Sequence, residues 1–296
     1  QFQYLFGIAF FMMLVGFFFF FSSAPFHMWA PDVYQGAPTP VTAFLSVVSK
    51  TAGFIIILRM IIFLYVEAPG DAVGAFDFME INNIYIAFLA GVTMIVGNVV
   101  ALRQSNMKRM LAYSSIAHAG YLLVSIATLG YFTSSIIWLY LVAYMLMNLG
   151  AFAVIQYMQE KTGSTEITSY AGLYKQEPLL AVTMGIFLLS MAGIPGTAGF
   201  IGKMYILIGT FAINPSNYVL ASLLIGTTIV SYVYYFGVLK QMFFQPANMQ
   251  AENNKIPKAP GLLIVLFICV VGTLILGVLP GLALDFLGDF NQFDDF

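Results

Sequence analysis

The chain has 296 residues, of which 60% are apolar and only 8% charged, with a formal net charge of −2 at pH 7. A soluble domain carries about 25% charged residues, so this chain has too few to cover a water-facing surface, and disorder is excluded because it needs low hydrophobicity. The charge provides no basic field for nucleic acid, and one cysteine, Cys269, cannot form a disulfide framework. The composition predicts a protein that crosses a membrane several times.

Eight apolar segments are long enough to cross the bilayer, because a helical span needs about 20 residues. They are also too long and too evenly apolar for barrel strands, so we predict an all-α polytopic membrane protein. In chain order they cover residues 4–24, 41–66, 81–102, 109–130, 133–158, 179–210, 216–243 and 261–284. The sequence runs from Gln1 directly into the first segment, so we expect no signal peptide and a chain that belongs to a longer protein.

Basic residues occupy the connections on one side of these spans only. That side holds Arg103, Lys108, Arg109, Lys161, Lys175, Lys240, Lys255 and Lys258. The opposite connections and the C-terminal tail hold the acids Glu67, Asp71, Asp77, Glu80, Asp285, Asp289, Asp294 and Asp295 and neither lysine nor arginine. The positive-inside rule therefore predicts that the basic loops are cytoplasmic and that both ends lie outside.

The sixth segment is too long for one straight helix, since it would extend about 48 Å. Its middle contains Gly193, Pro195 and Gly196; the proline lacks an N–H group and clashes with the preceding turn, and the glycines relax the backbone. We predict two half-helices around residues 193–199. The first segment also ends near a proline, Pro25, and runs in the opposite direction, an arrangement typical of inverted-repeat transporters. The alternative is one proline kink and an ordinary loop.

Two lysines lie deep within the spans, where a charge is costly. Lys50 lies about 14 Å into the second span, and Lys203 about 12 Å beyond Pro195, by helical rise. A lysine removed from water readily loses and regains its proton, which favours a functional role. The alternatives are that Lys50 pairs with an acid outside these spans to lock helices and that Lys203 reaches the interface. The functional role requires both side-chain nitrogens to lie inside the protein.

His118 lies one helical turn after Ser114, so the two share a helix face. A histidine beside hydroxyl groups can relay protons through water, although a buried histidine can also be simply hydrogen-bonded. Tyr113, Ser114 and Ser115 are candidates for ordering that water. Lys108, at the start of the same span, is either a secondary member of this group or a charge that only orients the span.

Four prolines occur between Pro25 and Pro40, and we expect a rigid loop there. Asp32 in this loop is expected to pair with Lys108 or Arg109 or to cap the next helix. Two histidines and one cysteine cannot build a zinc site, an iron–sulfur cluster or a haem pair, and no nucleotide-binding motif occurs. We therefore expect no metal and no redox cofactor on this chain.

Three stretches resemble the antiporter-like membrane subunits of respiratory complex I, the proton-translocating NADH–quinone oxidoreductase. They are residues 24–54 with Pro25-Phe26-His27 and Ser49-Lys50, residues 108–121 with Tyr113-Ser114-Ser115, and residues 192–203 with Gly193-Ile194-Pro195. Within the family, Asp32-Val33-Tyr34-Gln35-Gly36 and Lys50 resemble the subunit N branch, called subunit 2 in mitochondria and chloroplasts. The resemblance covers nearly the whole chain.

The resemblance implies one transmembrane domain that forms the last eight of fourteen spans. Residues 1–66 would be the remainder of a first inverted repeat, 81–243 a second repeat, and 261–296 the C-terminal span and outer tail. A glutamate that partners the channel lysine in this family would precede Gln1. The implied partners are lipid and the other membrane-arm subunits, in an energy-transducing membrane such as the bacterial inner membrane. NADH, FMN, iron–sulfur clusters and quinone would bind to partner subunits.

The resemblance also implies roles for the buried groups: Lys50 as a proton carrier at the midplane, His118 as a relay and Lys203 as the terminal group. Charges about 8 Å apart interact by about 2 kcal/mol at an effective dielectric constant near 20, so a change at one group is felt by the next. A subunit of a sodium/proton antiporter or of a membrane-bound hydrogenase is an alternative, as is a scaffold that conducts nothing.

One position departs from the family pattern. Related proteins usually place a lysine five residues before Pro25, where this chain has Phe20. Three explanations follow: Lys50 replaces that lysine, the protein conducts poorly, or the sequence is altered within its run of five phenylalanines.

Overall fold

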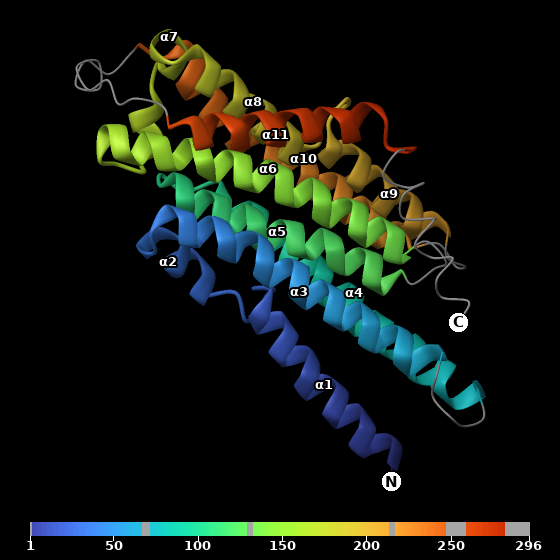
Figure 1. Ribbon diagram of the computed structural model, residues 1–296. Coiled ribbons are helices and arrows are strands. Elements are labelled where there is room, and N and C mark those ends of the chain that lie inside the picture. Colours follow the sequence, from blue (N-terminus) through green and yellow to red (C-terminus); the bar gives the residue numbers. More distant parts are fainter. Residues whose placement is uncertain (1, 67–71, 129–132, 213–216, 247–258, 282–296) are drawn as a thin grey trace.

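The computed structural model describes residues 2–66, 72–128, 133–212, 217–246 and 259–281, which form an all-helical bundle (Figure 1). In chain order its elements are α1 Phe2–Phe20, α2 Trp29–Gly36, α3 Thr39–Val66, α4 Ala72–Ala101, α5 Met107–Ala127, α6 Thr133–Thr162, the 3-10 helix η1 Ile167–Tyr170, α7 Leu173–Gln176, α8 Pro178–Ala192, α9 Ala198–Ala212, α10 Tyr218–Phe244 and α11 Pro260–Val278.

The helices confirm the predicted class. Within the described ranges, α3, α4, α5, α6, α10 and α11 contain segments long and apolar enough to cross a membrane, and α1, α8 and α9 contain shorter apolar segments. The predicted sixth span consists of α8 and α9, separated by residues 193–197, so the predicted interruption is confirmed. α1 and the α8–α9 pair run in opposite directions (Figure 1).

Helix α5 lies at the centre of the bundle (Figure 1). Every residue of α5 except Arg109 and Tyr113 is buried. The helix begins at Asn106, whose side-chain oxygen accepts hydrogen bonds from two backbone N–H groups of the first turn, as an N-cap residue does. Close packing against α4 requires Gly97, because a Cβ atom there would lie 2.5 Å from the backbone nitrogen of Ala117. The polar side chains of α5 are therefore enclosed by neighbouring helices.

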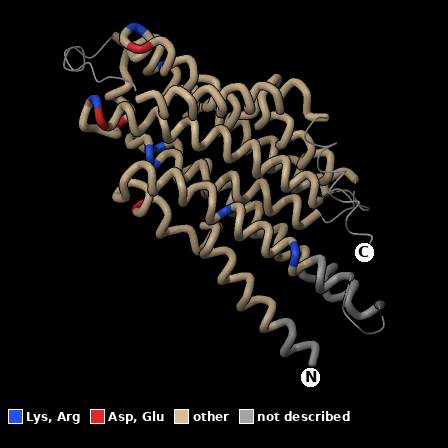
Figure 2. Tube along the Cα trace, in the orientation of Figure 1, with Lys and Arg blue, Asp and Glu red and all other residues tan. Residues whose placement is uncertain are grey.

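The basic connections meet at one end of the bundle (Figure 2). Backbone hydrogen bonds join the start of α5 to the segment before η1, from Met107 to Thr165 at 2.8 Å, and join Gly172 to Gln241 near the end of α10 at 3.1 Å. Part of the predicted charge pattern lies outside the described residues. This part comprises Lys255, Lys258, Glu67, Asp71, Asp285, Asp289, Asp294 and Asp295, together with the side chains of Asp77 and Glu80.

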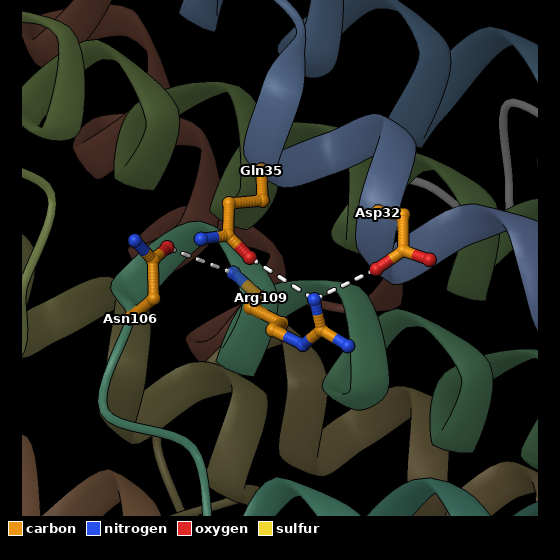
Figure 3. A network of polar contacts seen from close by, with 4 residues as sticks. All are labelled: Asp32, Gln35, Asn106 and Arg109. Carbon is orange, nitrogen blue, oxygen red and sulfur yellow. Dashed lines mark hydrogen bonds and ion pairs between the residues drawn. The ribbon is translucent and has the colours of Figure 1, made fainter.

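The prediction of a rigid loop between residues 25 and 40 is wrong in part, because α2 forms inside it. Pro31 lies in the first turn of α2, and Pro40 in the first turn of α3, where the missing N–H group has no helical partner to lose. Arg109 Nη1 holds α2 against α5 by donating to Asp32 Oδ1 at 2.7 Å and to Gln35 Oε1 at 3.0 Å (Figure 3). Of the pairings expected for Asp32, the one with Arg109 is confirmed.

Candidate functional site

The side chains of Lys50 on α3 and Lys203 on α9 are buried, with 1% and 5% of their residue surface exposed. In the described part of the chain, neither makes an ion pair with an acidic side chain. The expected burial of both lysines is confirmed, and extension of Lys203 to the interface is excluded. The stabilisation of each ammonium group must come from other partners.

Helix α8 ends in a left-handed turn at Gly193, where φ is 89°. The N–H groups of Gly193 and Ile194 donate to the carbonyls of Ser190 and Leu189 at 3.0 and 3.1 Å, which is the Schellman pattern of a helix C-terminus. This pattern satisfies two of the four carbonyls that a helix end leaves unpaired. The last two carbonyls of α8 need partners from elsewhere.

Lys203 supplies those partners. Its Nζ atom donates to the carbonyl oxygens of Met191 at 2.9 Å and Ala192 at 3.1 Å. The C-terminal end of a helix carries partial negative charge, so α8 stabilises the ammonium group without a carboxylate. The Nζ atom also lies 4.8 Å from the centre of the Tyr121 ring, within range of a cation–π interaction.

Helix α1 ends in the same way, in a left-handed turn at Ser22, where φ is 60°. The N–H groups of Ser22 and Ser23 donate to carbonyls three and five residues earlier, at 3.2 and 2.8 Å. The Nζ atom of Lys50 donates to the carbonyl of Phe21, the residue just before this turn, at 3.1 Å, and lies 6.0 Å from the centre of the Tyr144 ring. Each buried lysine therefore caps the C-terminal end of an interrupted helix.

His118 on α5 lies between the two lysines. Its ring centre is 5.3 Å from that of Tyr144, next to Lys50, and 5.5 Å from that of Tyr121, next to Lys203. The three candidate proton carriers thus form one continuous group inside the bundle.

Tyrosine hydroxyls surround His118. Its Nδ1 atom lies 2.6 Å from Tyr140 Oη, and its Nε2 atom lies 3.4 Å from Tyr235 Oη. The Tyr235 hydroxyl also bonds to the Ser114 hydroxyl. The predicted shared face of Ser114 and His118 is confirmed, because one hydroxyl of α10 contacts both side chains.

Further polar contacts extend this group. The hydroxyls of Ser115 and Tyr34 are 3.3 Å apart, which links α5 to α2. Asn98 on α4 donates to Tyr121 Oη at 3.1 Å and accepts from Tyr234 Oη at 2.9 Å. Buried hydroxyls without a protein partner in the described part of the chain, such as those of Ser23, Tyr144 and Ser125, are groups that ordered water satisfies in proteins.

The remaining predicted residues have other surroundings. Tyr113 is half-buried, packs against the core and makes none of these hydrogen bonds. Lys108 is buried and its Nζ atom donates to the carbonyl of Ala37, just after α2, at 2.8 Å. Pro195 and Gly196 lie in the break between α8 and α9, and Pro25 lies in the turn between α1 and α2.

Sequence reasoning missed the tyrosines and the asparagine that contact His118 and its neighbours. A weak signal exists in the spacing of Tyr140 and Tyr144, four residues apart on one face of α6. As for metals, the described residues contain no group of three or more histidine, cysteine, aspartate or glutamate side chains that could hold an ion.

Comparison with known proteins gives a consistent result. The family described as "NADH:quinone oxidoreductase/Mrp antiporter, TM" matches residues 3–230. The chain is 56% identical over 286 residues to NADH-quinone oxidoreductase subunit N of Geobacillus sp. strain WCH70, covering 97% of this chain and 58% of that protein. It is 54% identical over 294 residues to the same subunit of Anoxybacillus flavithermus strain DSM 21510 / WK1, covering 99% of this chain and 58% of that protein.

The fold agrees with these matches. A chain of respiratory complex I from Thermus thermophilus with bound aureothin superposes with a TM-score of 0.77 and 34% identity, covering 94% of this chain and 58% of that chain. The present chain therefore spans less than two thirds of the length of these relatives. The matched family, the helical bundle with its interrupted helices and the buried lysines together show that the chain belongs to the transmembrane family of NADH:quinone oxidoreductase and Mrp antiporter subunits.

Proposed function

We propose that this protein is subunit N of a proton-translocating NADH–quinone oxidoreductase and that it moves protons through the membrane by way of Lys50, His118 and Lys203. The observation that carries this proposal is the pair of buried lysines, each bonded to the carbonyl end of an interrupted helix and each next to a tyrosine ring that neighbours His118. A charge held inside a membrane protein in this way is costly, so its presence indicates a function. The names of the relatives support the same assignment.

Each carrier has a defined role in this proposal. Lys50 takes up a proton near the midplane, His118 relays it and Lys203 is the terminal group. Because the lysines are held by neutral carbonyls, each side chain can lose its proton without leaving a carboxylate unpaired inside the protein.

Water completes the path in this proposal. Ser114 and Ser115 order that water, helped by the hydroxyl of Tyr144, which has no hydrogen-bond partner among the described residues, while Tyr113 and Lys108 play secondary parts. Proton transfer along water and hydroxyl groups requires such unsatisfied positions, because each group must be able to accept one hydrogen bond and donate another.

The position of Phe20 favours the explanation that Lys50 takes the role of the lysine that related proteins carry there. Phe20 is the last residue of α1 and 45% of its surface is exposed. The Lys50 ammonium group bonds to the carbonyl of the following residue, Phe21, and so lies near the point where related proteins carry a lysine. This contact supports Lys50 as the carrier of the first half of the path.

The wider assignment follows from the family and the charge pattern. We place the bundle in a bacterial inner membrane, with its basic end in the cytoplasm and its C-terminus on the outer side. Residues 1–66 then belong to a first inverted repeat, 81–243 to a second, and 261–296 to the final span and tail. Other membrane-arm subunits and lipid surround the chain, and NADH, FMN, iron–sulfur clusters and quinone bind to partner subunits.

Replacement of each lysine in the assembled complex tests the proposal. Lys203→Met and Lys50→Met keep a long side chain but remove the charge, and we expect both to abolish most of the proton uptake into vesicles that accompanies NADH oxidation. Lys240→Met, at an exposed site near the end of α10, is the matched control and should pump normally. Normal pumping by both buried-site variants would leave only a scaffold role, and sodium-dependent transport without NADH oxidation would favour the antiporter.

A further inference from the structure

His118 has one tyrosine hydroxyl on each ring nitrogen. Nδ1 lies 2.6 Å from Tyr140 Oη and Nε2 lies 3.4 Å from Tyr235 Oη, and all three side chains are buried. A neutral imidazole donates a hydrogen bond from one nitrogen and accepts one at the other. Which nitrogen carries the hydrogen therefore depends on what the two hydroxyls can do, because the atomic positions alone leave it open.

The Tyr140 hydroxyl determines whether Nδ1 of His118 donates or accepts a hydrogen bond. Among the described residues, Nδ1 of His118 is its only hydrogen-bond partner. If Nδ1 carried the hydrogen, the hydroxyl hydrogen of Tyr140 would have no acceptor among these residues, whereas with Nδ1 as the acceptor it forms a hydrogen bond at 2.6 Å. The hydroxyl therefore donates to Nδ1. The Tyr140 ring is also confined by the backbone of α9, since a Cβ atom at Gly202 would lie 2.5 Å from Tyr140 Cδ2.

The role of Nε2 follows from the assignment of Nδ1. With Nδ1 accepting, the hydrogen of the neutral ring is on Nε2 and points to Tyr235 Oη. The Tyr235 hydroxyl can then donate its own hydrogen to Ser114, which it contacts. In this arrangement the hydrogens of Tyr140, His118 and Tyr235 all have acceptors, whereas the opposite tautomer leaves that of Tyr140 unpaired.

We propose that resting His118 carries its hydrogen on Nε2 and that Tyr140 is the positioning residue that selects this tautomer. The hydrogen bonds then run in one direction, from Tyr140 through His118 and Tyr235 to Ser114. This inference rests on the proposed function, in which His118 relays protons between Lys50 and Lys203.

The oriented bonds define one transfer. The transfer begins when water enters the path and delivers a proton to Tyr140 Oη, and that oxygen passes its own proton to Nδ1. The Nε2 proton then passes to Tyr235 Oη, whose proton moves to Ser114, and Ser114 releases its own proton to water. Each side chain gains one proton and loses one, His118 gaining at Nδ1 and losing at Nε2, and every bond in the chain ends reversed. The bonds must turn back before a second proton can follow in the same direction.

The test uses the full-length protein in the assembled complex, with histidine labelled by heavy isotopes. The infrared ring vibrations that differ between the wild type and His118→Gln report the tautomer of His118. We expect the Nε2–H form in the wild type and a shift toward the Nδ1–H form in Tyr140→Phe, which loses only one oxygen atom. We also expect the rate of proton pumping in Tyr140→Phe to fall by about a hundredfold or more, the lower end of what a positioned proton donor contributes.

Tyr232→Phe provides the control, because Tyr232 lies half-buried on the same helix as Tyr235 but outside this chain of bonds, and it should pump normally. An Nδ1–H signal in the wild type would overturn the tautomer assignment. An unchanged tautomer in Tyr140→Phe would overturn the positioning role, even if pumping falls. Normal pumping by His118→Gln would instead refute the proposed function and leave the tautomer assignment standing, so the two failures are distinguishable.

Discussion

The two interrupted helices of this protein hold a buried ammonium group by the same motif, but with different strength. At the end of α8, Lys203 donates to two carbonyls and lies 4.8 Å from an aromatic ring centre. At the end of α1, Lys50 donates to one carbonyl and lies 6.0 Å from a ring centre. The α8 end thus provides partners for all four of its terminal carbonyls, whereas the α1 end provides fewer bonds for the same charge.

The two sites also differ in how the second half-helix is attached. Only residues 193–197 separate α8 from α9, and the N–H group of Gly199 donates to the Ser190 hydroxyl at 3.1 Å. Residues 21–28 separate α1 from α2, which is held instead by side chains of α5. The hydrogen bonds of Lys203 therefore lie within the single stretch of chain that forms α8 and α9, whereas Lys50 on α3 bonds to the end of a separate helix, α1. This difference makes the first site sensitive to backbone packing and the second to longer-range contacts.

The largest effect is expected from Gly199→Ala. A Cβ atom at residue 199 would lie 1.9 Å from the carbonyl oxygen of Ser190, which is backbone and cannot rotate away. We expect a loss of about 3 kcal/mol of stability or more, at the upper end of what overpacking costs. The measurement is the thermal unfolding midpoint of the full-length protein in detergent and its yield in the membrane.

The matched variant at the Lys50 site is Gly53→Ala. There the added Cβ atom would lie 2.9 Å from Phe21 Cδ1 and 3.1 Å from Phe20 Cδ1, both of which are side-chain atoms that can shift. We expect a loss of about 1 kcal/mol. Equal losses in the two variants would contradict the view that the α8–α9 break is the more rigid of the two.

Much of the Lys203 site was predictable because its parts depart from an apolar background. A lysine inside a span and a proline between glycines are rare enough to be informative, and the break at residues 193–197 lies where it was predicted. The partners of the lysines were not predictable. Sequence reasoning looked for a carboxylate, whereas both ammonium groups bind backbone carbonyls, which every residue carries and no pattern marks.

The partners of His118 escaped prediction for a related reason. The chain contains 17 tyrosines, so the presence of one in a span says little about whether its hydroxyl reaches a distant side chain. The contact between His118 and Tyr235 depends on how α5 packs against α10, which is a property of the bundle. Helix α2 escaped because four prolines favour a loop locally, while its contacts with α5 favour a helix.

Exchanging the residues of the two left-handed turns should change stability by an intermediate amount, with opposite sign at the two breaks. Ser22 adopts a φ of 60° and Gly193 a φ of 89°, a region that costs a residue with a Cβ atom roughly 1 kcal/mol but costs glycine little. Ser22→Gly should raise stability by up to about 1 kcal/mol, and Gly193→Ser should lower it by about 1–2 kcal/mol. The thermal unfolding midpoints of the two variants should therefore move in opposite directions, and a shift of both in the same direction would show that the two turns are not equivalent.

The smallest effect is expected from the exposed ion pair between α2 and α5. Asp32 and Arg109 are 2.7 Å apart, but their side chains are 73% and 34% exposed, so water and salt screen the pair (Figure 3). Asp32→Asn should lower stability by less than about 1 kcal/mol, and the loss should shrink further at high salt, as measured by thermal unfolding in two ionic strengths. The reason is that α2 is also attached through a part-buried bond from Lys108 to the carbonyl of Ala37 and a buried bond between Tyr34 and Ser115. A large loss that persists at high salt would mean that the exposed pair holds α2 in place. The stability of the region around Lys50 would then depend on a surface ion pair as strongly as that of the region around Lys203 depends on its glycines.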